Sequence, residues 1–301
     1  MPFNFILLQD NIRKDAPKTI QWFKDNGVDI KIISGDNPVT VSEVARRCGV
    51  DNCDKYISLH GMSPNQVVEA SNKYTIFGRV SPEQKAILVK ALKSQGKTVA
   101  MTGDGVNDIL ALKEADCSIA IAAGSDAARS VSQLVLLDSN FSSMPSVVAE
   151  GRRVVNNIQK SSALFLMKTI FAICIAVFVL CMNKTYPFSP IQFILLETIV
   201  IGLPSFFLAL QPNTNPIKGK FMANLAKNSL PAGICLVAAT IAMYIYQMFT
   251  GISTEVLVTM ASIAIVTIGF IALFKQCKPF NWFKSVMFIT FAIICIICRT
   301  S

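Results

Sequence analysis

Two acidic residues stand in the polar turn Thr102-Gly103-Asp104-Gly105-Val106-Asn107-Asp108, which follows an apolar run over residues 98–101. The run is typical of a short buried parallel strand, and a helical pattern follows from Asn107 to Glu114. Ligands bind at the carboxyl ends of strands in open α/β sheets, and carboxylate oxygens are the ligands that Mg²⁺ prefers. The turn therefore predicts phosphate chemistry that uses a metal. A solvated turn is the alternative, because glycine, aspartate and asparagine are common turn residues.

A second polar turn, Ser34-Gly35-Asp36, follows a strand expected over residues 29–33 and precedes a helix expected over residues 39–48. The N-terminus of a helix carries partial positive charge, which favours a phosphoryl group beside the Ser34 hydroxyl. Simple capping of that helix is the alternative interpretation.

The segment Pro82-Glu83-Gln84-Lys85 places Lys85 in the first turn of a helix expected to run to about Ser94, with Ser81 as its N-cap. A cation there opposes the helix dipole at a cost of about 0.3–1 kcal/mol, which a nearby phosphate would offset. A lysine that reaches into water is the alternative.

Strands and helices alternate around these turns. Strands are expected over residues 3–8, 29–33, 74–77, 98–101, 117–121 and 134–137, whereas residues 51–73 carry turn signals and little periodicity. Such alternation is typical of a doubly wound, mostly parallel sheet. We therefore expect an α/β domain over residues 1–141.

The rest of the chain is apolar, and the whole has 52% hydrophobic residues and a mean hydropathy of +0.49. Nine basic but only two acidic residues, Glu197 and Glu255, follow residue 160. Of five apolar runs, the first four approach the ~20 residues that a bilayer span requires, and the last is shorter unless Phe283 and Lys284 lie at the interface. We therefore expect an all-α domain of about five transmembrane helices over residues 161–301. The runs are residues 164–182, 191–210, 230–249, 256–274 and 286–298. The basic excess lies between them, which favours a membrane lipid surface over nucleic acid as the partner.

Charge also predicts the orientation of this integral membrane protein. Lysines gather in residues 218–227 and 275–284, which are two crossings apart. The positive-inside rule places both loops, with the α/β domain, on the cytoplasmic side of what we expect to be the plasma membrane. Residues 142–160 are expected to form a stalk helix that enters the membrane.

Glu197 lies inside the second apolar run, seven residues before Pro204. A carboxylate within a membrane is costly and by default marks an ion path. Gly202 and Pro204 would break the helix locally and free carbonyl oxygens as further ligands. Protonation of Glu197, or its pairing with Lys168 from the preceding run, is the alternative.

The stretch from Thr102 to Asp108 resembles the hinge signature of P-type ATPases, the phosphoenzyme-forming ion pumps with a haloacid-dehalogenase-like core. Ser34-Gly35-Asp36 resembles their Thr-Gly-Asp element, residues 82–85 resemble their Pro-Glu-x-Lys element, and residues 196–204 resemble their sixth membrane helix. The resemblance implies ATP as substrate, Mg²⁺ held by Asp104 and a transported cation bound with the help of Glu197. It implies these catalytic residues: Ser34, Gly35, Asp36, Lys85, Asn107 and Asp108, of which Asp108 supports the loop.

The resemblance extends from the second half of a phosphorylation domain to the ninth of the family's ten membrane helices. The sequence contains no Asp-Lys-Thr element, which carries the phosphorylated aspartate in the family. We therefore expect the C-terminal part of a pump, inactive alone, with an N-terminal half-pump polypeptide as a partner. Familiar calcium and sodium pumps carry a carboxylate where this chain has Ile201, so the resemblance does not transfer an ion.

Two other hypotheses stay open. One is a non-catalytic truncated or regulatory membrane fragment without ATPase activity, which the lack of a nucleophile favours. The other is a membrane-anchored phosphatase of the haloacid-dehalogenase type. Its nucleophile would be Asp10, which follows a strand but lacks a second acid two residues on.

Overall fold

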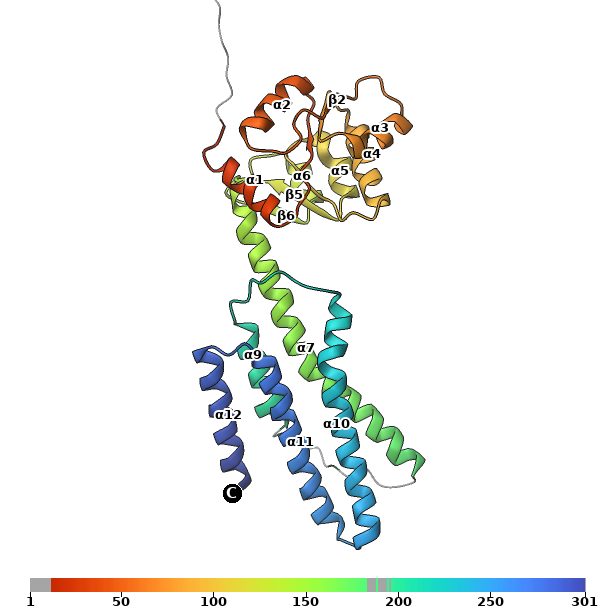
Figure 1. Cartoon of the computed structure of the whole chain (residues 1–301), viewed down its shortest axis with the longest axis vertical. Coiled ribbons are helices and arrows are strands. Elements are labelled where there is room, and N and C mark those ends of the chain that lie inside the picture. The colour runs from red at the N-terminus through yellow and green to blue at the C-terminus, as the bar shows by residue number, and fades with distance from the viewer. Residues whose placement is uncertain (1–11, 183–187, 189–193, 195, 301) are drawn as a thin grey trace, which may run out of the picture. The chain divides into compact units, whose positions relative to one another are not determined.

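The computed structural model describes residues 12–182, 188, 194 and 196–300. The strand expected over residues 3–8 lies outside the described residues. The chain divides into two compact units, Met1–Val147 and Val148–Ser301, which are taken one at a time below. Figure 1 shows α/β structure in the first unit and helices in the second.

Six parallel strands in the described part of the first unit form two sheets. The first sheet has the order β1-β3-β2, with β1 at Ile32–Ile33, β3 at Ile76–Gly78 and β2 at Tyr56–Ser58. The second has the order β4-β5-β6, with β4 at Ala100–Gly103, β5 at Cys117–Ile121 and β6 at Leu134–Leu136. The predicted parallel α/β fold is confirmed. The strands form two sheets rather than one, because no described strand pairs with both β1 and β4.

Helices connect the strands, and their caps explain where they begin. Asn37 accepts a hydrogen bond from the Val39 N–H, and Ser81 accepts one from the Gln84 N–H, as N-cap side chains do. The helices of this unit are α1 (Ala16–Asp25), α2 (Pro38–Arg47), α3 (Pro64–Lys73), α4 (Pro82–Ser94), η1 (Val106–Asp108), α5 (Ile109–Glu114), α6 (Asp126–Val131) and η2 (Phe141–Ser143). Leu59, Phe77 and Leu88 are fully buried between α3, α4 and the first sheet.

The interpretation of residues 51–73 as turns was wrong, since β2 and α3 lie there. A signal for α3 was present in the sequence. Ser63, Pro64 and Gln66 are an N-cap, a first helical proline and a capping-box partner, and the Gln66 side chain accepts from the Ser63 N–H at 2.8 Å.

The second unit is helical, as predicted. Its described elements are α7 (Met144–Cys181), which begins in the first unit, the π-helix η3 (Leu196–Gly202), α9 (Leu203–Ala209), α10 (Phe221–Thr250), α11 (Thr254–Cys277) and α12 (Trp282–Thr300). Among the described residues, α7, α10 and α11 are long and apolar enough to cross a membrane. The runs expected at 191–210 and 286–298 correspond to shorter apolar helices, the first of which is described from residue 196.

Apolar side chains cover both the inside and the outside of this unit. Leu164, Phe171, Leu196 and Leu236 are buried in its core. Large apolar side chains are also exposed along every long helix, for example Leu180, Phe249, Ile271 and Ile293. Such a continuous apolar exterior is stable against lipid rather than water.

Candidate functional site

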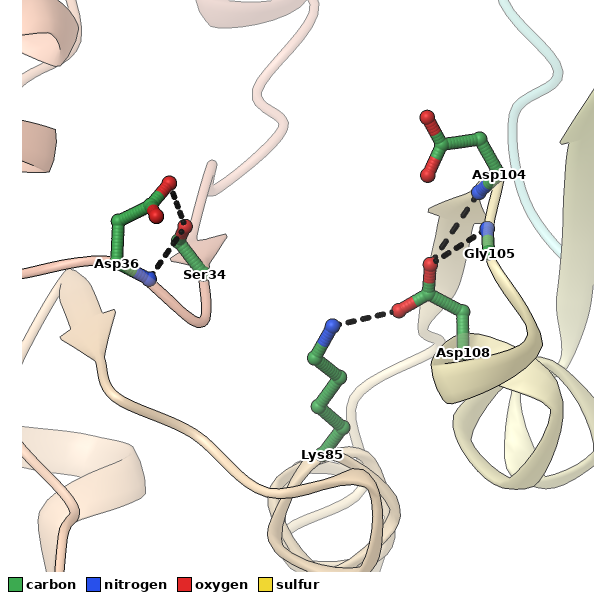
Figure 2. Close-up of polar contacts among 6 residues, drawn as sticks. All are labelled: Ser34, Asp36, Lys85, Asp104, Gly105 and Asp108. Atoms are coloured by element: carbon green, nitrogen blue, oxygen red, sulfur yellow. Dashed lines mark hydrogen bonds and ion pairs between the residues drawn. The ribbon is translucent and has the colours of Figure 1, made fainter. Parts of the chain in front are cut away.

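The Asp104 turn begins where β4 ends, and Asp108 holds it together. One carboxylate oxygen of Asp108 accepts the N–H groups of Asp104 and Gly105, both at 3.2 Å. The other oxygen forms an ion pair with Lys85 Nζ at 2.7 Å. The Asp108 side chain is 10% exposed and that of Lys85 is 12% exposed, so water screens this pair poorly. Figure 2 shows the three partners converging on Asp108.

Gly103 makes this network possible. A Cβ at position 103 would lie 2.6 Å from Asp108 Cβ and 2.8 Å from its Cγ, which is too close for any side chain. The requirement for glycine at 103 is therefore steric, and it serves the placement of Asp108.

Lys85 reaches the network from the first turn of α4. The Gln84 side chain accepts from the Ser81 N–H at 3.1 Å and donates to the Leu59 carbonyl at 2.8 Å, so the start of α4 is fixed. The backbone amide of Glu83 and then the Ser81 hydroxyl hold the pKa of the Glu83 carboxyl below its usual value. The cost of a cation in this turn is offset by Asp108.

The Ser34 turn forms a separate group at the end of β1. Ser34 Oγ accepts the Asp36 N–H at 3.2 Å and donates to Asp36 Oδ2 at 3.1 Å. No hydrogen bond or ion pair joins Ser34 or Asp36 to Lys85, Asp104 or Asp108, although Figure 2 shows the two groups facing the same space. Both turns follow the carboxyl ends of parallel strands, as the sequence predicts. Gly35 is exposed and has open space around it.

Two further glycines fix these turns, and the sequence patterns did not indicate either. A Cβ on Gly78 would lie 2.7 Å from the Asp36 carbonyl oxygen, and one on Gly124 would lie 2.5 Å from that of Asp104. The neighbouring amides also bind these turns, since Arg79 N–H donates to the Asp36 carbonyl and Ser125 N–H to that of Asp104. Their only sequence signal is a glycine at or shortly after the end of a strand, since Gly78 ends β3 and Gly124 lies three residues beyond β5.

Asp104 and Asn107 are exposed on the outer side of the turn. The Asp104 carboxylate has no hydrogen bond or ion pair to any residue that the structure describes, whereas both oxygens of Asp108 are engaged. No cluster of three or more metal-binding side chains occurs among the described residues. Mg²⁺ keeps several waters and takes one or two carboxylates plus phosphate oxygens, so one exposed carboxylate fits it.

Glu197 occupies the π-helix η3 of the second unit and forms an ion pair with Lys168 of α7. Their side chains are 49% and 32% exposed in the chain by itself. A π-helix is rare and is frequent at functional sites. Gly202 permits this turn, since a Cβ there would lie 2.9 Å from the Glu197 carbonyl oxygen. The structure thus pairs Glu197 with Lys168, the partner that the sequence analysis gave as the alternative to an ion site.

Comparison with known proteins identifies the class to which these motifs belong. The family model for haloacid dehalogenase-like hydrolases matches residues 2–116. A probable cation-transporting ATPase of Streptococcus pneumoniae is 38% identical over 288 residues, which cover 93% of this chain and 37% of the relative. A calcium-transporting ATPase of Mycolicibacterium smegmatis is 37% identical over 302 residues, which cover 94% of this chain and 38% of the relative.

These relatives match nearly the whole chain, including both polar turns and the helical unit. The chain spans somewhat over a third of their length. Its haloacid-dehalogenase-like first unit and its apolar helices agree with that similarity. The chain therefore belongs to the P-type cation-transporting ATPases.

Proposed function

We propose that the chain is the C-terminal part of an ion pump that couples ATP hydrolysis, through an aspartyl phosphate, to cation transport. The observation that supports this most is the Lys85–Asp108 pair, which fixes the turn while leaving the Asp104 carboxylate exposed and unpaired among the described residues. A fixed turn with one free hard ligand suits phosphoryl transfer, where catalysis is mostly positioning and charge stabilisation.

In this proposal the roles follow from where each group lies. The Asp104 carboxylate holds Mg²⁺, which neutralises charge on the phosphoryl oxygens. The Ser34 hydroxyl, positioned by Gly35 and Asp36, donates to the phosphoryl group, and the exposed Asn107 amide contacts it from the other turn. Lys85 keeps its ion pair with Asp108 and adds positive charge nearby.

The nucleophile comes from an N-terminal half-pump polypeptide. Its aspartate carboxylate attacks the γ-phosphorus of ATP, the bond to the β,γ-bridging oxygen breaks, and ADP leaves. Water then cleaves the acyl phosphate and restores the carboxylate. The chain alone is inactive in this scheme because no nucleophile reaches the site.

The membrane half binds the cation at Glu197. Lys168 competes with the cation for the Glu197 carboxylate, so a cation that binds there must displace the lysine ammonium. Relatives at 37% identity are named calcium-transporting, which makes Ca²⁺ the first ion to test. We further propose a domain division of 1–141, 142–160 as a stalk and 161–301, with the α/β domain on the cytoplasmic side of the plasma membrane.

The test is acyl-phosphate formation from ATP with Mg²⁺ in membranes that hold this chain alone, or this chain with a polypeptide supplying the rest of the relatives' length. The proposal expects label only in the combined sample, on an aspartate of the added polypeptide. Label on this chain alone would refute the assignment of the nucleophile. Absence of label in both samples would favour a non-catalytic fragment.

A further inference from the structure

Two lysines of the second unit reach the same loop. The Lys160 Nζ of α7 donates to the Lys278 carbonyl at 3.2 Å, and the Lys284 Nζ of α12 donates to the Pro279 carbonyl at 3.0 Å. These carbonyls belong to consecutive residues just after α11, so the two ammonium groups lie close to one another. Three helices therefore bring two positive charges to one place.

Both lysines are withdrawn from water. Lys284 is 7% exposed, and Lys160 is partly buried. An ammonium group has three donors, but among the described residues each of these two has a single hydrogen-bond acceptor, the loop carbonyl. Because a buried charge is costly unless it is paired and hydrogen-bonded, the two groups have donors and charge left for a ligand.

No carboxylate side chain of the second unit neutralises these lysines. The sequence from residue 148 onward has three acidic residues. Glu150 pairs with Arg153, and Glu197 pairs with Lys168. Glu255 lies in the first turn of α11, whereas the loop follows the last turn, which places it ~33 Å away along the helix. The loop therefore keeps an excess of positive charge.

Capping of a helix end is the alternative explanation for these lysines. The C-terminus of a helix such as α11 carries the equivalent of about half a negative charge and attracts cations. Two ammonium groups bring about four times that charge with the opposite sign. Capping therefore leaves most of the positive charge without compensation.

The loop lies where the chain leaves the apolar layer. The helix α11 is long and apolar enough to cross a membrane, and the apolar part of α7 begins soon after Lys160. Exposed aromatic side chains flank the loop at Phe274, Phe280 and Trp282, as is common at the level of the lipid headgroups. The anion that is concentrated at this level is the phosphate of phospholipids, and basic pockets between membrane helices bind such headgroups.

We propose that Lys160 and Lys284 form a binding site for the headgroup phosphate of an anionic phospholipid. Lys160 is partly exposed and contacts the phosphate oxygens, whereas Lys284 adds its charge from the buried side. Phosphatidylcholine suits the site less well, because its own ammonium group neutralises its phosphate. The inference concerns the membrane unit and goes beyond the proposed function, since it does not depend on ATP hydrolysis.

The test uses the full chain in vesicles of equal parts phosphatidylglycerol and phosphatidylcholine. Phe280→Trp in a Trp22→Phe, Trp282→Phe background puts the one tryptophan beside Pro279, since the sequence has two tryptophans. Bromine on the lipid tails quenches a tryptophan that the lipid contacts, so the same mixture is measured with bromine on one lipid and then on the other. Equal quenching by the two lipids would overturn the proposal.

The expected result is stronger quenching by brominated phosphatidylglycerol. Each lysine near an anionic lipid contributes about fivefold to its binding, so the two together should favour phosphatidylglycerol over phosphatidylcholine by about tenfold or more. Lys160→Gln should lower this preference about fivefold, and Lys160→Arg, which keeps the charge, should retain it.

Lys227→Gln is the matched control, because it removes the same charge from an exposed position on α10. It should leave the preference unchanged, and unchanged secondary structure by circular dichroism shows that each variant folds. If Lys227→Gln lowers the preference as much as Lys160→Gln does, the total charge of the chain attracts the lipid and the proposal is wrong.

Inorganic phosphate distinguishes the lipid from a soluble source of the same chemistry. An excess of inorganic phosphate, exchanged for chloride at constant ionic strength, should leave the preference for phosphatidylglycerol unchanged. Loss of the preference would show that soluble phosphate fills the site, which would contradict the assignment to a lipid. The assay needs no ATP, so its outcome is independent of whether acyl phosphate forms.

Discussion

Lys85 with Asp108 in the first unit and Lys168 with Glu197 in the second are both lysine–carboxylate pairs, but their surroundings differ. Asp108 accepts two backbone N–H groups in addition to the lysine, and both members of its pair are close to nine-tenths buried. Glu197 has Lys168 as its one ion-pair partner among the described residues, and both side chains are substantially exposed.

The difference indicates separate roles. A carboxylate whose oxygens are all engaged cannot take up a ligand without breaking the turn, which supports the proposal that Asp108 is structural and that Asp104 binds the ligand. A carboxylate with one partly exposed partner can exchange that partner for a cation. The comparison therefore supports the proposal that the Lys85–Asp108 pair keeps the turn rigid and that the Lys168–Glu197 pair exchanges its lysine for a cation.

The largest expected effect is that of Asp108→Ala. It leaves the Lys85 ammonium and two N–H groups without a buried partner, which should lower the free energy of unfolding of the first unit by about 3–5 kcal/mol. Trp22 fluorescence in a Trp282→Phe background reports this unit during urea unfolding, since the sequence has two tryptophans. The exposed Asp54→Asn is the control and should change little. A loss under about 1 kcal/mol for Asp108→Ala would mean that the network does not hold the turn.

A smaller loss is expected from Gly103→Ala. The new Cβ would overlap Asp108 Cβ at 2.6 Å and force the carboxylate aside, at a cost of about 1–3 kcal/mol by the same fluorescence assay. Gly105→Ala is a matched control two residues away, because its Cβ would meet nothing closer than 3.7 Å. Equal effects of the two substitutions would contradict the steric account.

We expect a weak energetic coupling between Lys168 and Glu197. In a double-mutant cycle of Lys168→Met and Glu197→Gln, we expect a coupling energy of about 0.6 kcal/mol, as polar pairs between membrane helices have on average. Thermal unfolding of the second unit, followed by Trp282 in a Trp22→Phe background, supplies the four stabilities. Coupling above about 2 kcal/mol would make this pair as structural as Lys85 and Asp108.

The smallest expected effect is on the loss of stability at low pH. The Val99 N–H donates to the Asp116 carboxylate at 2.9 Å and, followed by the Lys93 ammonium, lowers its pKa. A carboxyl whose pKa is lower in the folded state contributes stability that is present above its unfolded pKa and lost as pH falls through the folded value. Unfolding midpoints in urea should therefore fall less between pH 6 and pH 3 in Asp116→Asn than in the wild type. An identical pH dependence would show that this bond contributes nothing.

The elements beside the turns could be predicted from the sequence because their signals are local. Ser81 and Pro82 determine where α4 begins, and an apolar run followed by Gly103 determines where β4 ends. The partner of Lys85 could not be predicted, since Asp108 lies 23 residues away and only the packing of α4 against the turn joins them. The separation into two sheets could not be predicted either, because the sequence pattern indicates where strands lie but not which strands pair.

Asp104→Asn in the assembled pump tests the central claim most directly, since Asp104 is the free carboxylate that the Asp108 network presents. The account predicts that this variant forms no detectable phosphoenzyme from ATP and Mg²⁺, while its first unit unfolds at the same urea concentration as the wild type. Normal phosphorylation and turnover in Asp104→Asn would contradict the account.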